Sequence, residues 1–392
     1  MPASIRQPVI IKKEYTRLPH NGSVPQKSPK GPKILTALLS IVALIALVHF
    51  LIIMRTGDMH ASPAATCSSL VKNSDYTKYV PFDAGSQQIE AIQYIDQLMG
   101  GQPAALVQVM DTQHTLDVYI YGCSIHATTP VLTVLFKQQG LIQGTVSVSK
   151  ANTLLLGERD TTLSPETTAI IQPMQQNLYQ EYSWQNGAFV QTRFPGLYPV
   201  TSRSEAEALQ EQANNGQSLL WNDPQSTATQ MAKDILLWSS DTYQESLLDN
   251  NGMLAHVLLE KQHPHLALTV TLTRLVQKDA KGLWFVTHAQ TQGITLDQAH
   301  LSVPTTSPIT IHGTVTTTMD GQAEATLFDH TITAVSSLNN AALTLTAEGA
   351  YSGSLLYTDT KQTQQGLLLI ENIPPGGSSG AGQILLTAVV LG

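Results

Sequence analysis

Residues 34–54 read ILTALLSIVALIALVHFLIIM and contain no charged residue, no proline and no glycine. Fourteen of these 21 residues are Leu, Ile, Val or Phe. A helix rises about 1.5 Å per residue, so this stretch would span roughly 30 Å, the thickness of a bilayer's hydrocarbon core. The stretch predicts a single transmembrane helix over residues 34–54, with the lipid bilayer as its partner.

The residues before this stretch are basic. Residues 1–33 carry seven Lys and Arg against Glu14 alone, although the whole chain has a net charge of −8. Because basic flanks stay on the cytoplasmic side, we expect a cytoplasmic N-terminus and an extracytoplasmic region over residues 55–392. The protein would then be anchored in the cell membrane. A cleaved signal peptide is the rival interpretation, but its apolar region would be shorter and closer to the N-terminus. The acidic remainder argues against nucleic-acid binding, which needs clustered Lys and Arg.

The composition changes along the chain and predicts six segments. Residues 1–33 form a disordered basic tail, residues 34–54 the membrane helix and residues 55–66 a linker. An α+β domain follows at 67–200, a second helix-plus-sheet unit at 201–297 and a β-sandwich at 298–392. The predicted fold class is therefore a single-pass membrane protein whose extracytoplasmic part is α+β, with helices packed on antiparallel sheet, followed by an all-β immunoglobulin-like sandwich.

Three helix starts can be read from capping residues. Ser86 precedes isoleucines at three-residue spacing, which predicts a helix ending near Met99. Ser202 and Glu205 have the spacing of a capping box, and Asp223 precedes a proline at the first helical position. Each helix is followed by alternating runs typical of strands, so the helix-on-sheet unit is either duplicated or occurs as two unrelated stretches.

The last 95 residues lack helical patterns and contain seven short alternating runs separated by Gly and Pro turns. Such spacing is typical of a β-sandwich. The runs are 309–315, 323–327, 331–335, 343–346, 353–357, 367–371 and 383–391.

The chain has two cysteines, Cys67 and Cys123. In an oxidising compartment they could form a disulfide, worth about 4 kcal/mol by chain entropy. The alternative is two separate small side chains. Their spacing fits neither a metal site nor a redox motif.

Five aromatic residues lie close together in the sequence and form the one candidate binding surface. They could stack on a sugar or a peptide, or pack in the core of a hairpin. No catalytic, cofactor or metal motif accompanies them, so we predict no catalytic residues, no cofactor and no metal. The five are Tyr182, Trp184, Phe189, Phe194 and Tyr198.

The C-terminal runs resemble a known domain. The segments SPITIHGTV (307–315), EATLFD (324–329), YSGSLLY (351–357), GLLLI (366–370) and ILLTAVVL (384–391) are similar to the immunoglobulin-like domain of bacterial spore-germination proteins. The match departs at residues 316–321, where TTTMDG replaces the Phe-Glu pair that often follows the first strand. The resemblance implies a non-enzymatic module on surface-anchored proteins, and it brings no catalytic residues.

Two functions follow from these observations. The first is a membrane-anchored, extracytoplasmic interaction protein of a bacterial envelope, linked through the resemblance to sporulation or germination, whose partner is an envelope protein or a cell-wall polymer. The second is an envelope enzyme or ligand sensor with a site in residues 68–297, which would require a cleft with convergent ionisable groups. A purely structural spacer is a third possibility.

Overall fold

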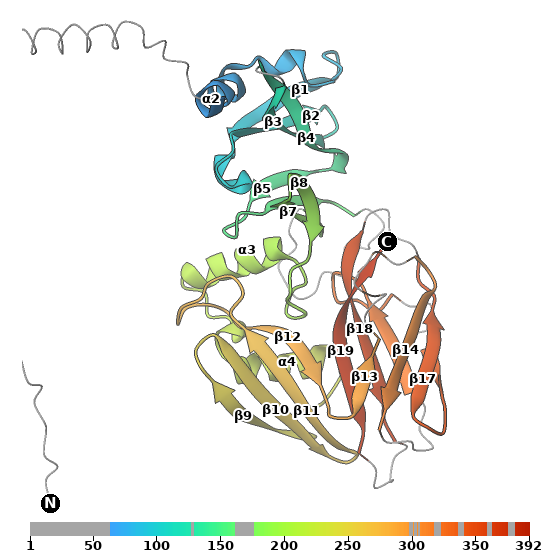
Figure 1. Cartoon of the computed structure of the whole chain (residues 1–392). Helices are drawn as coiled ribbons and strands as arrows, with labels where there is room; N and C mark the ends of the chain where they lie inside the picture. The colour runs from blue at the N-terminus through green and yellow to red at the C-terminus, as the bar shows by residue number, and fades with distance from the viewer. Residues whose placement is uncertain are drawn as a thin grey trace, which may run out of the picture. The chain divides into compact units, whose positions relative to one another are not determined.

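Antiparallel sheets dominate the chain (Figure 1). The computed structural model describes residues 63–126, 129–160, 176–297, 301, 304, 306–316, 323–335, 341–358, 363–374 and 381–392. Within these residues the strands form two four-stranded sheets and one eleven-stranded sheet. All of them belong to one compact unit that begins at Ser62.

The structure corrects the predicted fold class, because the described residues are mostly β instead of α+β. The predicted transmembrane segment 34–54 lies outside the described residues, as do the tail 1–33 and most of the linker 55–66. No helix in the described part of the chain is long and apolar enough to cross a bilayer. The longest of them has 12 residues, whereas a span needs about 20. Single-pass anchoring in the cell membrane, with the orientation predicted from it, is unsupported and is set aside.

The first sheet has the order β1-β2-β3-β4 and carries helix α2 on one face. Apolar side chains of β2 and β3 alternate between the two faces, so the sheet is buried on both sides. The elements are α2 (Pro63–Asn73), η1 (Tyr76–Lys78), β1 (Gln87–Tyr94), η2 (Asp96–Met99), β2 (Ala104–Asp111), β3 (Thr115–His126) and β4 (Thr129–Ile142).

The helix predicted after Ser86 is wrong, because residues 87–94 form strand β1. Ile89 pairs with Val109 of β2, and Ile92 is 42% exposed, so the expected helical face does not exist. β-branched isoleucine favours strands, and here pairing with β2 outweighs the three-residue spacing.

The second sheet has the order β5-β6-β7-β8. Asn186 and Gly187 both have positive φ and form the tight turn between β7 and β8, the position at which an Asn-Gly pair is typical. Apolar side chains of this sheet share a core with the first sheet. The strands are β5 (Thr145–Val148), β6 (Leu154–Glu158), β7 (Leu178–Gln185) and β8 (Ala188–Thr192).

Helices α3 (Arg203–Asn214) and α4 (Pro224–Asp234) confirm the two predicted caps. The Ser202 hydroxyl accepts the Glu205 backbone N–H and donates to the Glu205 carboxylate, at 3.2 and 2.7 Å. Asp223 accepts the backbone N–H of Ser226 at 2.8 Å. A short 3-10 turn, η4 (Leu220–Asn222), precedes α4.

The third sheet crosses the predicted boundary between the second unit and the sandwich. Strands β12 and β19 pair at Ala289 with Leu386 and at Gln290 with Leu385, which joins the two regions into one sheet. α3 and α4 contribute to the core on one face of this sheet. The strands of this region are β9 (Tyr243–Asn250), β10 (Leu254–Gln262), β11 (His265–Thr273), β12 (Phe285–Gln290) and β13 (Ile294–Leu296).

The C-terminal strands form two layers around a common core. β13, β14, β17 and β16 pair in one layer and β15, β18 and β19 in the other, and β16 pairs with both. Six of the seven predicted runs are strands; residues 331–335 make only an isolated bridge at Ala334. The strands are β14 (Ile309–Val315), β15 (Ala323–Phe328), β16 (Ala341–Leu345), β17 (Ala350–Leu355), β18 (Gln364–Asn372) and β19 (Gln383–Leu391).

Candidate functional site

A cavity of about 220 Å³ lies where the β7–β8 hairpin, the N-terminus of α3 and strands β18 and β19 meet. Its walls combine apolar side chains with amides and hydroxyls. Val190, Phe194 and Val390 provide apolar surface, and Gln364 and Gln365 provide amides. The cavity is thus built from segments more than 200 residues apart in the chain, such as those of Tyr179 and Val390.

An ion pair forms the most polar part of the cavity wall. The Nε atom of Arg203 donates to Oε1 of Glu181 at 2.5 Å, and these side chains are only 15% and 7% exposed. The Thr153 hydroxyl donates to the same oxygen at 2.7 Å. The Arg203 guanidinium also lies over the ring of Phe194, 5.4 Å from its centroid. These contacts fix the orientation of the guanidinium, because charge pairing and cation–π contact act on the same group.

The terminal amino groups of Arg203 remain available. Within the described residues, neither Nη atom has a hydrogen-bond partner, and Arg203 lines the cavity. An arginine fork can bind a planar anion through two parallel hydrogen bonds. The two Nη groups of Arg203 are therefore the candidate donors to a ligand in the cavity.

The first turn of α3 adds backbone donors beside this guanidinium. Arg203 and Ser204 are the first two residues of the helix, and both line the cavity. The first N–H groups of a helix have no partner inside it, and they carry a partial positive charge. Here the capping box uses the N–H of Glu205, while none of the described residues accepts the N–H of Arg203 or Ser204.

Two glutamines of β18 form the opposite wall. The Gln364 side chain is hydrogen-bonded to the ring of His330, and it is 5% exposed. The Gln365 amide donates to the carbonyl of Gly196 at 3.1 Å. The Thr201 hydroxyl donates to the His330 carbonyl at 2.9 Å. These bonds connect β18 to the segment that leads into α3 and so hold the cavity walls together.

A second hollow of about 450 Å³ adjoins the cavity. Both are lined by Arg193, Phe194 and Gln365, and the second hollow continues along β19 past Thr387 and Ala388. The two hollows therefore have Arg193, Phe194 and Gln365 as a common wall.

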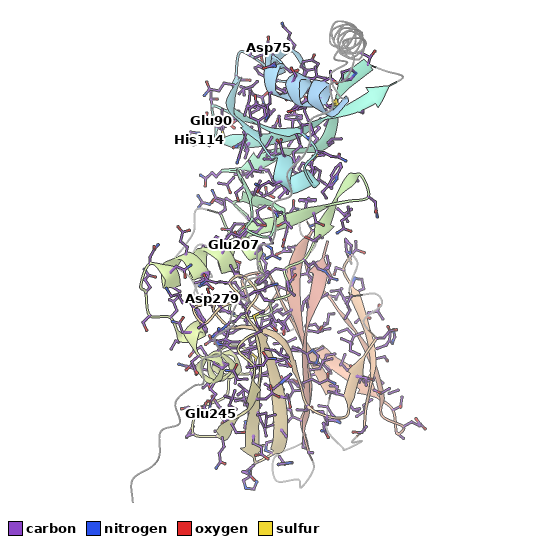
Figure 2. All side chains as sticks on the ribbon, turned by 60° about the vertical axis from the view of Figure 1, so that its left-hand side comes forward. Asp75, Glu90, His114, Glu207, Glu245 and Asp279 are labelled. Atoms are coloured by element: carbon purple, nitrogen blue, oxygen red, sulfur yellow. A yellow bond between two sulfur atoms is a disulfide. The ribbon has the colours of Figure 1, made fainter. Side chains whose placement is uncertain are left out.

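Two ionisable groups near this site have shifted pKa values. Desolvation raises the pKa of Glu205 to about 7, against the hydrogen bonds from Ser202 that lower it. Burial also raises the pKa of Glu207, a residue of α3 that is labelled in Figure 2. Its carboxylate accepts the backbone N–H of Lys150 at 3.0 Å. Glu207 therefore fixes α3 to the turn between β5 and β6.

The structure separates the five predicted aromatic residues into two groups. Tyr182, Trp184 and Phe189 pack together with Phe136 between the first two sheets. Phe194 packs edge-on against Phe285, and Tyr198 against Trp221, in the core under α3 and α4. Only Phe194 lines the cavity, so the five do not form one surface.

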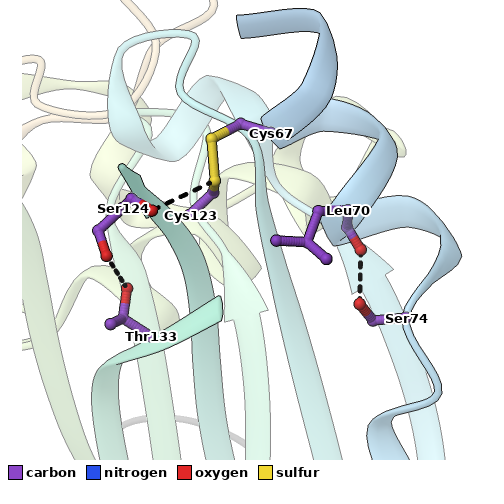
Figure 3. The surroundings of a disulfide bond; sticks show 6 residues. All are labelled: Cys67, Leu70, Ser74, Cys123, Ser124 and Thr133. Carbon is purple, nitrogen blue, oxygen red and sulfur yellow. Dashed lines mark hydrogen bonds between the residues drawn. A yellow bond between two sulfur atoms is a disulfide. The ribbon is translucent and has the colours of Figure 1, made fainter. Parts of the chain in front are cut away.

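Cys67 and Cys123 form a disulfide that joins α2 to β3 (Figure 3). Their Cα atoms are 5.5 Å apart, within the range that a disulfide can bridge. Cys67 is buried, and the bond lies next to the core under α2. Its position makes it a structural link, distant in sequence from the residues of the cavity.

The key cavity residues were not found from the sequence. Arg203 follows Ser202 of the capping box and Glu181 precedes the aromatic residue Tyr182, and neither belongs to a motif of its own. A buried ion pair between them depends on tertiary packing, because 22 positions separate the two residues. The sequence signal that could have indicated this site is Arg203 itself, because the helix dipole disfavours a basic residue in the first turn of a helix.

Comparison of the chain with protein-family models, with curated proteins and with solved structures found no match.

Proposed function

We propose that the chain is a non-enzymatic binding protein whose ligand occupies the cavity at the N-terminus of α3. The observation that supports this proposal most strongly is Arg203, which lines the cavity, is held by Glu181 and Phe194, and has no partner for its two terminal amino groups among the described residues. A buried ion pair contributes little net stability compared with apolar residues of similar size. The Arg203–Glu181 pair therefore suits a binding role better than a purely stabilising one.

The lining residues favour binding over catalysis. Among the described residues of the cavity wall, the ionisable ones are Tyr179, Glu181, Arg193 and Arg203. Glu181 is engaged by Arg203 and Thr153, and burial raises the pKa of Tyr179 far above neutrality. General acid–base catalysis needs a group that titrates near the working pH. Burial moves the pKa of Tyr179 further from that range, and Glu205, whose pKa is raised to about 7, is not among the described lining residues.

The cellular setting of the proposal rests on two supports. Disulfides persist in oxidising compartments, which suits the Cys67–Cys123 bond. The resemblance of the C-terminal strands to the spore-germination domain supports a bacterial envelope setting, with an envelope protein or cell-wall polymer as the partner. A ligand sensor would use the same cavity and would also pass a signal on when the ligand binds.

A fragment screen on the full chain tests this function. Amino acids, short peptides and small saccharides would be screened by ligand-observed NMR against the wild type and Val190→Trp. Val190 is 44% exposed and lines the cavity, so a larger side chain there would fill its mouth. Val134→Trp is the matched control, because Val134 is 52% exposed on β4 and does not line the cavity. We expect binding that is lost only in Val190→Trp; a screen without such a compound would refute the proposal.

A further inference from the structure

We propose that the cavity binds the C-terminal carboxylate of an extended peptide, with the terminal amino groups of Arg203 as its main contact and the rest of the peptide in the adjoining hollow. This inference rests on the proposed function, because it assigns a ligand class to the same cavity.

The geometry of Arg203 suits a carboxylate. Glu181 engages the Nε atom of Arg203, which lines the cavity, and neither Nη atom has a hydrogen-bond partner among the described residues. A carboxylate matches that edge through two parallel hydrogen bonds. Phe194 and Glu181 hold the guanidinium before the ligand arrives, which reduces the entropy lost on binding.

The charge of the site favours an anion. Arg193 and Arg203 line the cavity, and Glu181, which neutralises one of them, is the acidic residue among the described lining residues. The N-terminus of α3 adds partial positive charge and the backbone N–H groups of Arg203 and Ser204. An anionic group is thus attracted to the cavity even though the whole chain is acidic.

The shape of the site favours the end of a chain. Ligand pockets for whole drug-sized molecules usually measure roughly 300–1,000 Å³, whereas this cavity has about 220 Å³. It shares Arg193, Phe194 and Gln365 with a hollow of about 450 Å³. A peptide fits this arrangement, with its carboxylate and last residue in the cavity and the preceding residues in the second hollow. Gln364, whose side-chain oxygen is paired with His330, can offer its amide N–H to an extended backbone.

The test compares two peptides that differ in one group. N-acetyl-trialanine with a free carboxylate and its C-terminal amide would be titrated calorimetrically into the full chain. We expect the acid to bind at least tenfold more tightly than the amide. Arg203→Gln should remove this preference, Arg203→Lys should keep part of it, and Arg159→Gln should keep all of it. Arg159 is the matched control, because it contacts Gln143 outside the cavity. Thermal unfolding would verify that each variant is folded.

Several results would overturn the inference. Equal affinity of the acid and the amide, with both lost in Val190→Trp, would disprove carboxylate recognition and leave the binding function intact. Binding of a glucuronate disaccharide without any binding of the peptides would overturn the peptide assignment. An unchanged preference for the acid in a folded Arg203→Gln variant would show that Arg203 is not the contact. Failure of both peptides to bind at millimolar concentration would overturn the inference, and the fragment screen would then decide the proposed function separately.

Discussion

The Nε atom of Arg203, in the first turn of α3, lies 2.5 Å from the Oε1 atom of Glu181 on β7. This pair joins the helix to the second sheet, and both side chains are largely buried. It therefore has two consequences that can be measured separately: the stability of the chain and the affinity of the cavity.

Glu181→Gln should destabilise the chain. The substitution leaves the Arg203 guanidinium buried without its counter-charge, which costs about 3 kcal/mol in other proteins. Urea unfolding measures the change. Glu207→Gln on the same helix is the control and should cost less than about 1 kcal/mol, because a glutamine oxygen can still accept the N–H of Lys150. Equal stability of Glu181→Gln and the wild type would mean that the pair does not hold α3 in place.

Reduction of the Cys67–Cys123 bond should destabilise the region that contains α2 and the first sheet. The bond closes a loop between positions 56 apart, and a loop of that length is worth about 4 kcal/mol by chain entropy. We expect dithiothreitol to lower the urea midpoint of the wild type. The Cys67→Ala/Cys123→Ala variant should start at the lower midpoint and show no response to dithiothreitol. If dithiothreitol also lowered the urea midpoint of that variant, loss of the disulfide would not be the cause of the destabilisation.

Glu371 should make the stability depend on pH. It lies opposite Glu324 across β18 and β15, and desolvation followed by this like charge raises its pKa from 4.5 to about 7. Between these two pH values the folded chain holds a proton that the unfolded chain releases, so stability falls as pH rises and the loss is complete above pH 7.

Glu371→Gln removes that ionisation and should stabilise the chain at pH 8 by roughly 2 kcal/mol, with little effect at pH 4. Unfolding curves at both pH values measure this difference. Glu90→Gln is the control, since Glu90 is an exposed residue of β1 (Figure 2). A gain of the same size at both pH values would exclude ionisation of Glu371 as the cause.

Leu237→Gly should stabilise the chain by about 1 kcal/mol. Leu237 follows α4 with a φ of 55° and is 82% exposed. This left-handed conformation is unfavourable for residues with a Cβ atom and suits glycine after a helix. Leu248→Gly provides the contrast, because Leu248 is 54% exposed in strand β9, where glycine weakens the strand. Thermal melts should move in opposite directions, and a lower melting temperature for Leu237→Gly would contradict the prediction.

Helices whose first residues cap the backbone N–H groups could be predicted from local sequence. Ser202 and Asp223 correctly predict the starts of α3 and α4, because a helix cap depends on neighbouring backbone groups alone. The spacing of Ile89 and Ile92 predicted a helix, which is wrong because both residues lie in strand β1, paired with β2.

Long-range relationships could not be read in the same way. The pairing of Ala289 with Leu386 merges two segments that the composition separated. The cavity likewise joins Arg203 to Gln364 and Val390, and nothing in the local sequence of any of them indicates the others. Of the five aromatic residues proposed as a surface, only Phe194 reaches the cavity, because strand alternation and the turn after β8 direct the others into cores.

The most direct measurement of ligand binding is a crystal structure of the full chain with N-acetyl-trialanine. We expect the peptide carboxylate within hydrogen-bond distance of both Nη atoms of Arg203, with the preceding residues in the hollow beside Phe194. A peptide bound elsewhere, with the cavity empty and Arg203 contacting only Glu181, would contradict both the site and the ligand class proposed for it.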